Sequence, residues 1–265
     1  MRHDRTHSEA GHGGHGRRDL LLGALSLAGA SLLPRQARAD RYGPRGGTRI
    51  LVIGDSMIAG GFGLYLARAL GEELGYDVTR RGKASTGLAR PDFFDWIAEA
   101  RRLVGDEPFD ASLVMFGGND VQGLHMGKHA DPEWIRWQDE GWAREYARRV
   151  ARLAQVLAPD GQRLFWVGMP VMRPEKLHAR VQRINTIARA EMAIRRRSEI
   201  IDIWSLLAGP DGGYADRVEV AEPDGGPARR VQVRAGDGIH LTVAGAHLLA
   251  DHVRAVVHRT LTDGT

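Results

Sequence analysis

The sequence of 265 residues contains no cysteine. Disulfide bonds, thiolate nucleophiles and cysteine-ligated zinc are therefore excluded, while an oxidising compartment stays compatible with the chain. The apolar run at residues 20–33 is shorter than the roughly 20 residues that a membrane-spanning helix needs. The hydrophobic content of 43% is enough for one sizeable α/β domain, and no shift in composition marks a second one.

The first 39 residues differ in composition from the rest of the chain. Arg17 and Arg18 precede the apolar run, and the small residues Ala37 and Ala39 follow it. This order is typical of a secretory signal, and the paired arginines favour the twin-arginine route. We expect cleavage after Ala39, a periplasmic or secreted domain at 40–265, and the twin-arginine export machinery as a partner of the precursor. A leader that is retained as a membrane anchor is the alternative interpretation.

The basic surplus of the chain lies mainly in this leader. Residues 1–39 hold six of the 37 Lys and Arg residues and three of the 33 Asp and Glu residues, which leaves 31 basic and 30 acidic side chains. A nucleic-acid-binding surface needs a basic surplus that is gathered on one face. The nearly neutral charge of residues 40–265 therefore argues against a nucleic acid as partner.

Short apolar segments alternate with amphipathic ones along most of the remaining chain. The apolar segments predict strands, and the segments whose apolar residues recur every three or four positions predict helices. We expect strands at 49–53, 78–81, 111–116, 163–167 and 200–204, and helices at about 62–74, 93–103, 133–157, 175–197 and 243–261, the last capped by Thr242. This alternation implies a parallel sheet of about five strands with helices on both faces.

Residues 209–236 break the alternation, because they are rich in Gly, Asp and Pro. Two pieces of alternating polarity flank a turn at 223–226 and predict an inserted β-hairpin near 215–235. Ligands bind beyond the C-terminal ends of the strands in such sheets. We therefore favour the hairpin as one wall of a substrate cleft, with a solvated excursion as the alternative.

Ser56 follows the first predicted strand, at the point where the chain turns into a helix. Its hydroxyl is expected at the C-terminal edge of the sheet, where it can act as a nucleophile or only cap the helix. Near the other end of the chain, Asp237 precedes His240 by three positions, a spacing that brings both side chains to one face. The carboxylate can orient the imidazole, whose other nitrogen can accept the Ser56 proton. These three residues predict a catalytic triad.

Hydrogen-bond donors for an oxyanion are expected beside this triad. Asn119 follows a buried strand, and its amide can donate to a developing oxyanion without carrying a charge. Gly87 follows the second strand, where an N–H with no side chain in its way can approach a substrate closely; Gly82 is the alternative. The N–H of Ser56, at a helix start, completes the predicted oxyanion hole.

Four short segments resemble the motifs of the SGNH (GDSL-type) hydrolase superfamily, whose hallmark residues are Ser, Gly, Asn and His. The matching segments are Gly54-Asp55-Ser56, Ala84-Ser85-Thr86-Gly87, Gly117-Gly118-Asn119-Asp120 and Asp237-Gly238-Ile239-His240. The resemblance spans residues 49 to about 260, and residues 90–96 and 166–170 resemble an exported bacterial subfamily of unassigned substrate.

This resemblance implies a flavodoxin-like three-layer α/β/α sandwich. It also implies that Ser56 is the nucleophile, His240 the base and Asp237 its partner, with Ser56, Gly87 and Asn119 as oxyanion donors. The chain departs from the superfamily in the spacing around the second segment. This departure affects the assignment of Gly87 as an oxyanion donor.

From these observations we predict an exported serine esterase, a carboxylic ester hydrolase that needs no cofactor. No long apolar lid segment is present, which favours short acyl groups, and we expect acetyl esters of carbohydrate as substrates. A periplasmic polysaccharide O-acetyltransferase would use the same residues. A non-catalytic carbohydrate-binding module is the alternative from another class. The sequence does not decide the oligomeric state.

Other polar residues are candidates for lining the substrate cleft. They are Asp55, Arg90, Asp92 and Asp120. His125 and His129 are four residues apart, but they lack an accompanying glutamate on a helix, so the sequence predicts no metal site there.

Overall fold

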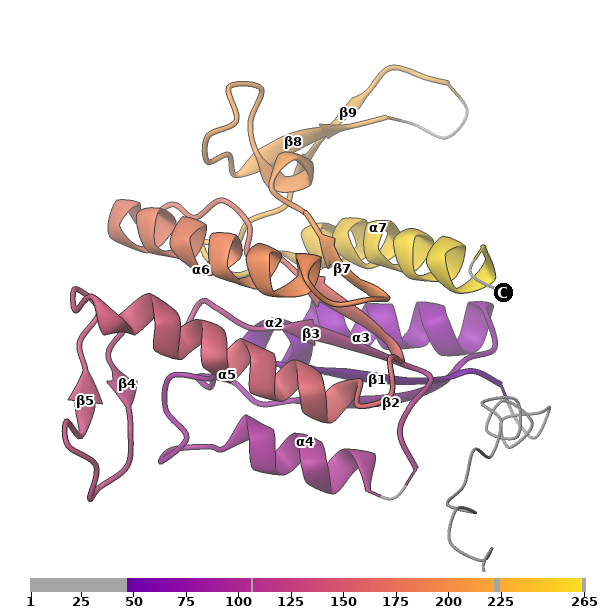
Figure 1. Ribbon diagram of the computed structural model, residues 1–265. Coiled ribbons are helices and arrows are strands. Elements are labelled where there is room, and N and C mark those ends of the chain that lie inside the picture. Colours follow the sequence, from indigo (N-terminus) through magenta and orange to yellow (C-terminus); the bar gives the residue numbers. More distant parts are fainter. Residues whose placement is uncertain (1–46, 106, 222–224, 264–265) are drawn as a thin grey trace, which may run out of the picture. The chain divides into compact units, whose positions relative to one another are not determined.

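The computed structural model of the protein describes residues 47–105, 107–221 and 225–263 (Figure 1). The predicted signal sequence and its cleavage site lie outside these residues. Within the described ranges, no helix combines the length and the apolar character that a membrane span requires.

Five parallel strands form the main sheet, in the spatial order β2-β1-β3-β6-β7. The strands are β1 (Arg49–Gly54), β2 (Asp77–Gly82), β3 (Ala111–Met115), β6 (Arg163–Val167) and β7 (Ser198–Ile201). In chain order this arrangement is 2-1-3-4-5, the order of flavodoxin-like folds. β3 is buried along its whole length and β1 along all but its first residue, as their continuous apolar runs predict.

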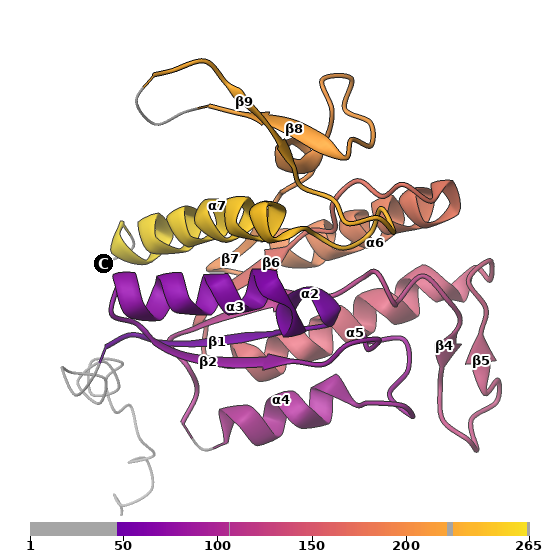
Figure 2. The same cartoon turned by 180° about the vertical axis from the view of Figure 1, so that it is seen from behind.

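Helices cover both faces of the sheet. On one face α3 (Gly61–Arg68) packs against α7 (Val243–Thr262), and Figure 2 shows this pair. On the other face α5 (Gly141–Leu157) packs against α4 (Trp96–Val104) and α6 (Glu175–Ala193). The predicted three-layer α/β/α sandwich is confirmed. As predicted, Thr242 caps α7, because its side chain accepts the N–H of Gly245 at 3.0 Å.

The predicted helix at 133–157 was wrong at its start. It begins only at Gly141, and the preceding segment contains the short strand β5 (Trp134–Ile135), which pairs antiparallel with β4 (Leu124–His125). Between β5 and the helix, the Asp139 carboxylate accepts the backbone N–H of Arg136 at 2.7 Å. That local bond closes a turn and competes with helix formation.

The chain after Ser56 is helical in three pieces. α2 (Ser56–Ala59) ends at Gly60, whose extended backbone separates it from α3, and α3 continues into the π-helical turn η2 (Ala69–Glu73). The break at Gly60 leaves Ser56 on its own short helix at the end of β1. The serine is thus placed by the strand rather than by the longer helix.

The predicted hairpin near 215–235 is present. β8 (Arg217–Val220) pairs antiparallel with β9 (Arg229–Gln232), and the 3₁₀ turn η3 (Ser205–Leu207) precedes them. In Figure 1 this hairpin stands apart from the main sheet. Its last strand leads directly into the segment that carries Asp237 and His240.

Candidate active site

Ser56 is the first residue of α2, and one residue, Asp55, separates it from the end of β1. The preceding Asp55 caps the helix, because its Oδ1 accepts the backbone N–H of Met57 at 3.0 Å. The first N–H groups of a helix have no partner within it, so the Ser56 N–H is available to a ligand. The strand end and the cap together hold the serine at the C-terminal edge of the sheet.

The structure brings the three predicted triad residues into one hydrogen-bonded chain. Ser56 Oγ lies 2.9 Å from His240 Nε2, and His240 Nδ1 lies 2.6 Å from Asp237 Oδ2. The other carboxylate oxygen of Asp237 accepts the backbone N–H groups of Ile239 and His240, at 2.8 and 2.9 Å. With the carboxylate fixed by its own loop, the imidazole is oriented with Nε2 toward the serine.

The electrostatics of this loop keep its carboxylate ionised. Burial raises the pKa of Asp237, but hydrogen bonds from the His240 ring and from the backbone N–H groups of Ile239 and His240 outweigh it and bring the pKa to about 2. An ionised carboxylate at Nδ1 favours the imidazole tautomer that leaves Nε2 free to accept a proton. The geometry therefore suits a general base for Ser56.

A buried arginine, which the sequence reasoning missed, supports the same loop. Arg234 is fully buried, and its guanidinium donates to the carbonyl of Ile239 at 3.0 Å and to the carbonyl of Val171. Burial lowers the pKa of Arg234 to about 10. Arg234 lies just before the Asp237 segment, and this position was the one signal in the sequence. Nothing local distinguishes it from the exposed arginines of β9.

Asn119 lies beside the segment that contains Gly87. Its Nδ2 donates to the carbonyl of Thr86 at 3.0 Å. The Thr86 side chain is itself held, because its Oγ1 donates to the carbonyl of Lys83 at 2.6 Å and accepts the indole N–H of Trp96 at 2.8 Å. Since an amide carries two N–H donors, one donor of Asn119 remains for a ligand.

The two glycines weighed as oxyanion donors are both required by close packing. A Cβ at Gly87 would lie 2.2 Å from Asp120 Oδ1, and a Cβ at Gly82 would lie 2.2 Å from the backbone nitrogen of Ala59. The Thr86–Gly87 peptide is trans, so its N–H points away from the carbonyl that Asn119 contacts. In this conformation the N–H groups of Gly87 and Asn119 do not point to one common position.

Asp55 and Asp120 do not line an open cleft, contrary to the prediction. Their side chains are buried, with exposures of 1% and 0%. Asp120 accepts the backbone N–H of Ala89 at 2.7 Å and the hydroxyl of Tyr146 at 2.8 Å. Burial raises the pKa of both carboxyl groups, that of Asp55 to about 7. They were misplaced because polar residues of a turn can fold inward to satisfy backbone donors.

Arg90 and Asp92 form an ion pair, with their nearest atoms 2.7 Å apart. The guanidinium of Arg90 also lies over the ring of Trp134 on β5, 5.0 Å from its centre. Neither residue lines the pocket that contains Ser56. Their predicted place in the cleft is therefore not seen in this pocket, and they instead join the segment after Gly87 to the β4–β5 hairpin.

The pocket that contains Ser56 has a volume of about 220 Å³. Ser56 and His240 line it, together with side chains from α3 and from the start of α7 such as Phe62, Tyr65 and Val243. No residue of β8 or β9 lines it, so the inserted hairpin is not a wall of this pocket. The pocket thus offers mainly apolar surface next to a serine and an imidazole.

Comparison with known proteins places this geometry in context. The sequence model of a family described as "Protein of unknown function (DUF459)" matches residues 49–256. No curated protein matches the chain. Among solved structures, an α/β hydrolase enzyme from the metagenome of Lake Arreo, Spain, has a TM-score of 0.54 at 18% identity, over 80% of this chain and 96% of that one.

Two further structures share the fold. A putative GDSL-like lipase from Bacteroides ovatus has a TM-score of 0.54 at 14% identity, over 82% of this chain and 54% of that one, so this chain spans about half its length. An acetyl xylan esterase from Geobacillus stearothermophilus has a TM-score of 0.51 at 19% identity, over 81% of this chain and 95% of that one. At such identities the likeness shows a common fold.

Proposed function

Since this chain belongs to the DUF459 family and has the fold of the SGNH hydrolase superfamily, we propose that it is a serine esterase whose nucleophile is Ser56. The observation that carries the proposal is the chain of short contacts from Ser56 Oγ through His240 to Asp237. A serine that only capped a helix would need neither an imidazole at its hydroxyl nor a carboxylate behind that imidazole.

The reaction would proceed in two steps. Ser56 Oγ bonds to the ester carbonyl carbon while its proton passes to His240 Nε2; the bond to the alcohol oxygen then breaks, and the alcohol leaves with that proton. Water next loses a proton to His240 and attacks the acyl carbon; the bond from that carbon to Ser56 Oγ then breaks, and His240 returns the proton to Oγ, which releases the acid and restores Ser56. Throughout, Asp237 stays ionised and stabilises the imidazolium.

We assign two donors to the oxyanion, one of which, Asn119, is not among the residues that line the pocket beside Ser56. They are the N–H of Ser56, at the start of α2, and the N–H of Asn119 that does not contact Thr86. Gly87 is the third proposed donor, and its N–H requires the Thr86–Gly87 peptide to turn over when a substrate binds.

We propose short acyl esters of carbohydrate as the substrate class. The support is the fold shared with an acetyl xylan esterase and the modest size of the pocket beside Ser56, about 220 Å³. The His240 side chain is 46% exposed, which gives water access to the acyl-enzyme. The leader at 1–39 supports export by the twin-arginine route, which would place the reaction in the periplasm or outside the cell.

The test compares the full chain with its Ser56→Ala variant on an aryl acetate, with and without oligosaccharide acceptors. The matched control is Ser205→Ala, which changes an exposed serine that does not line the pocket. We expect hydrolysis by the wild type and the control and a loss on the order of 10⁶ in the Ser56 variant. Acetyl groups found on the oligosaccharide would instead identify a transferase. Equal rates for all three proteins would contradict the assignment of Ser56.

A further inference from the structure

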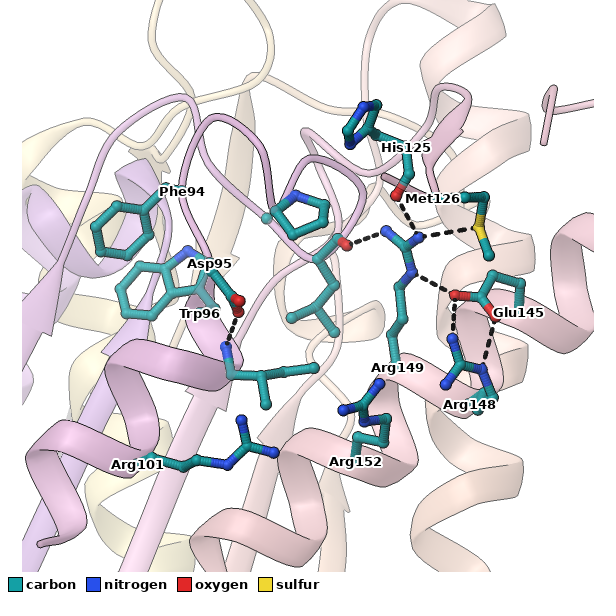
Figure 3. Close-up of a pocket in the computed structure, with 14 residues that line it drawn as sticks. Phe94, Asp95, Trp96, Arg101, His125, Met126, Glu145, Arg148, Arg149 and Arg152 are labelled. Carbon is teal, nitrogen blue, oxygen red and sulfur yellow. Dashed lines mark hydrogen bonds and ion pairs between the residues drawn. The ribbon is translucent and has the colours of Figure 1, made fainter. Parts of the chain in front are cut away.

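A second pocket, of about 210 Å³, lies between α4 and α5 (Figure 3). It shares no lining residue with the pocket that contains Ser56. Its volume is below the range of about 300–1,000 Å³ that is usual for small-molecule sites, so it suits one compact group.

The charge that lines this pocket is predominantly positive. Four arginines contribute to the lining, against two acidic residues, Asp95 and Glu145. Asp95 accepts the backbone N–H groups of Ile97 and Ala98 at 2.9 and 3.0 Å and so caps α4. Glu145 is engaged by two of the four arginines. Both carboxylates therefore already have partners within the protein.

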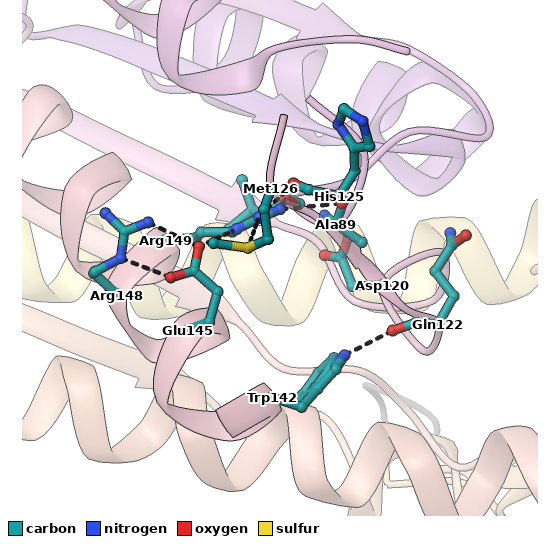
Figure 4. Close-up of polar contacts among 10 residues, drawn as sticks. Ala89, Asp120, Gln122, His125, Met126, Trp142, Glu145, Arg148 and Arg149 are labelled. Atoms are coloured by element: carbon teal, nitrogen blue, oxygen red, sulfur yellow. Dashed lines mark hydrogen bonds and ion pairs between the residues drawn. The ribbon is translucent and has the colours of Figure 1, made fainter. Parts of the chain in front are cut away.

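Arg149 is the structural member of this group. It is buried, donates to Glu145 at 2.8 Å, and donates further to the backbone carbonyls of Leu88, Ala89 and His125 (Figure 4). Arg148 also bonds Glu145, through two contacts of 2.7 and 2.8 Å. The donors of Arg149 are thus used to join α5 to the segment after Gly87 and to β4.

Arg101 and Arg152 differ from Arg149 both in burial and in hydrogen bonding. Both are exposed, and within the part of the chain that the structure describes neither makes an ion pair or a side-chain hydrogen bond. Figure 3 shows their guanidinium groups extending toward one another, Arg101 from α4 and Arg152 from α5. Two like charges thus face each other across the pocket with no carboxylate between them.

The arrangement has an energetic disadvantage for the protein alone. Arg148 is paired with Glu145, but Arg152, four residues further along α5, makes no ion pair within the described residues. Arg101 adds a further positive charge from the neighbouring helix. An anion bound between Arg101 and Arg152 would remove this repulsion.

The chemistry of the lining favours a carboxylate as that anion. Phosphate sites commonly use the free N–H groups at a helix N-terminus, but Asp95 already occupies those of α4. What remains are planar guanidinium groups, whose paired N–H donors match two oxygens of a carboxylate or of a phosphate, so the apolar part of the lining decides for an organic anion. Phe94 and Ile97 also line the pocket and supply apolar surface for the body of a ligand.

We propose that this pocket binds a compact organic carboxylate, of the size of a uronate sugar, between Arg101 and Arg152. The carboxylate accepts hydrogen bonds from both guanidinium groups, and the body of the ligand packs on Phe94. Gly87, the third proposed oxyanion donor, also lines this pocket, but the proposed contacts come from Arg101, Arg152 and Phe94, which do not line the pocket that contains Ser56, so the site stands even if the esterase proposal fails.

The test measures thermal unfolding of the full chain with D-glucuronate, with neutral D-glucose and with inorganic phosphate, all at one ionic strength. Glucuronate at tenfold excess over its Kd is expected to raise the Tm by about 3–6 °C, and glucose to leave it unchanged. The shift is expected to disappear in Arg101→Gln and in Arg152→Gln. It should persist in Ser56→Ala and in the control Arg68→Gln, which alters an exposed arginine on α3.

The unliganded variants give a second readout. Because Arg101 and Arg152 repel each other, each Gln variant should unfold at the same temperature as the wild type or at a higher one. A lower Tm without ligand, together with a glucuronate shift that survives in both variants, would make these arginines structural and overturn the site. Phosphate that raises the Tm through both arginines while glucuronate does not would overturn the carboxylate assignment.

Discussion

His240 Nε2 lies 2.9 Å from Ser56 Oγ, although 184 residues separate the two in the sequence. Ser56 follows the end of β1, and His240 stands just before α7, which packs against α3. The contact therefore depends on the layered fold as a whole. Because each residue is held by its own short segment, single substitutions can test the site while the sheet stays intact.

Asp237→Asn is expected to lower kcat by about 10⁴, because the amide no longer selects the His240 tautomer that accepts the serine proton. The Oδ1 of the new side chain can still accept the N–H groups of Ile239 and His240, so the Tm should change little. Aryl acetate hydrolysis and thermal unfolding measure the two effects. A kcat within tenfold of the wild type would remove Asp237 from the mechanism.

Asn119→Ala is expected to lower kcat by about 10²–10³ with a small change in KM, because the lost N–H acts on the oxyanion and not on the bound ester. Gln122→Ala is the comparison, since that side chain donates to the backbone carbonyl of Asn119 and so supports the loop without being one of the proposed oxyanion donors. If both variants lose the same activity, Asn119 supports the loop and does not act on the oxyanion.

Arg234→Met is expected to reduce both stability and turnover. The change leaves the carbonyl of buried Val171 without this donor, at a cost of about 1–3 kcal/mol, and also removes the contact to the partly buried carbonyl of Ile239. The loop that carries His240 then becomes less well positioned, so kcat should fall more than KM changes. Denaturant unfolding and steady-state kinetics give both values. The exposed Arg230→Met on β9 should leave each of them unchanged.

Asp55→Asn is expected to remove part of the pH dependence of stability. The pKa of Asp55 is about 7 in the folded protein, against about 3.9 in an unfolded chain, so the folded state holds this proton more tightly. Its stabilising contribution is complete below about pH 4 and is lost as the pH rises through 7. The difference between the folded and unfolded pKa values of Asp55 corresponds to a fall of roughly 4 kcal/mol in the free energy of unfolding between these pH limits.

The measurement is the free energy of unfolding at pH 5 and pH 8. The wild type should lose more stability between these values than Asp55→Asn, whose Oδ1 can still accept the Met57 N–H. Asp120 is also buried and has a raised pKa, so it accounts for the pH dependence of stability that remains in Asp55→Asn. Equal losses in both proteins would show that Asp55 does not retain a proton. Asp92→Asn, at an exposed ion pair, should behave as the wild type.

Much of the fold follows from local pattern. The buried strands β1 and β3 were predicted from continuous apolar runs, and the cap of α7 from Thr242, because such features depend on neighbouring residues. The start of α5 was predicted wrongly, since the pairing of Trp134–Ile135 with Leu124–His125 joins segments whose contact no helical periodicity reveals. The side chains of Asp55 and Asp120 were likewise misplaced, because burial depends on what packs over a turn.

The sequence by itself determined the alternation of strands and helices and supplied a serine, an asparagine and an Asp–His pair at the ends of elements. Those properties are local, since they rest on spacing along the chain. Only the tertiary structure decided that Ser56 meets His240, that Arg234 lies beneath their loop, and that Arg101 and Arg152 face each other between two helices. These are contacts between distant segments, and they exist only because the parallel sheet fixes where each helix packs.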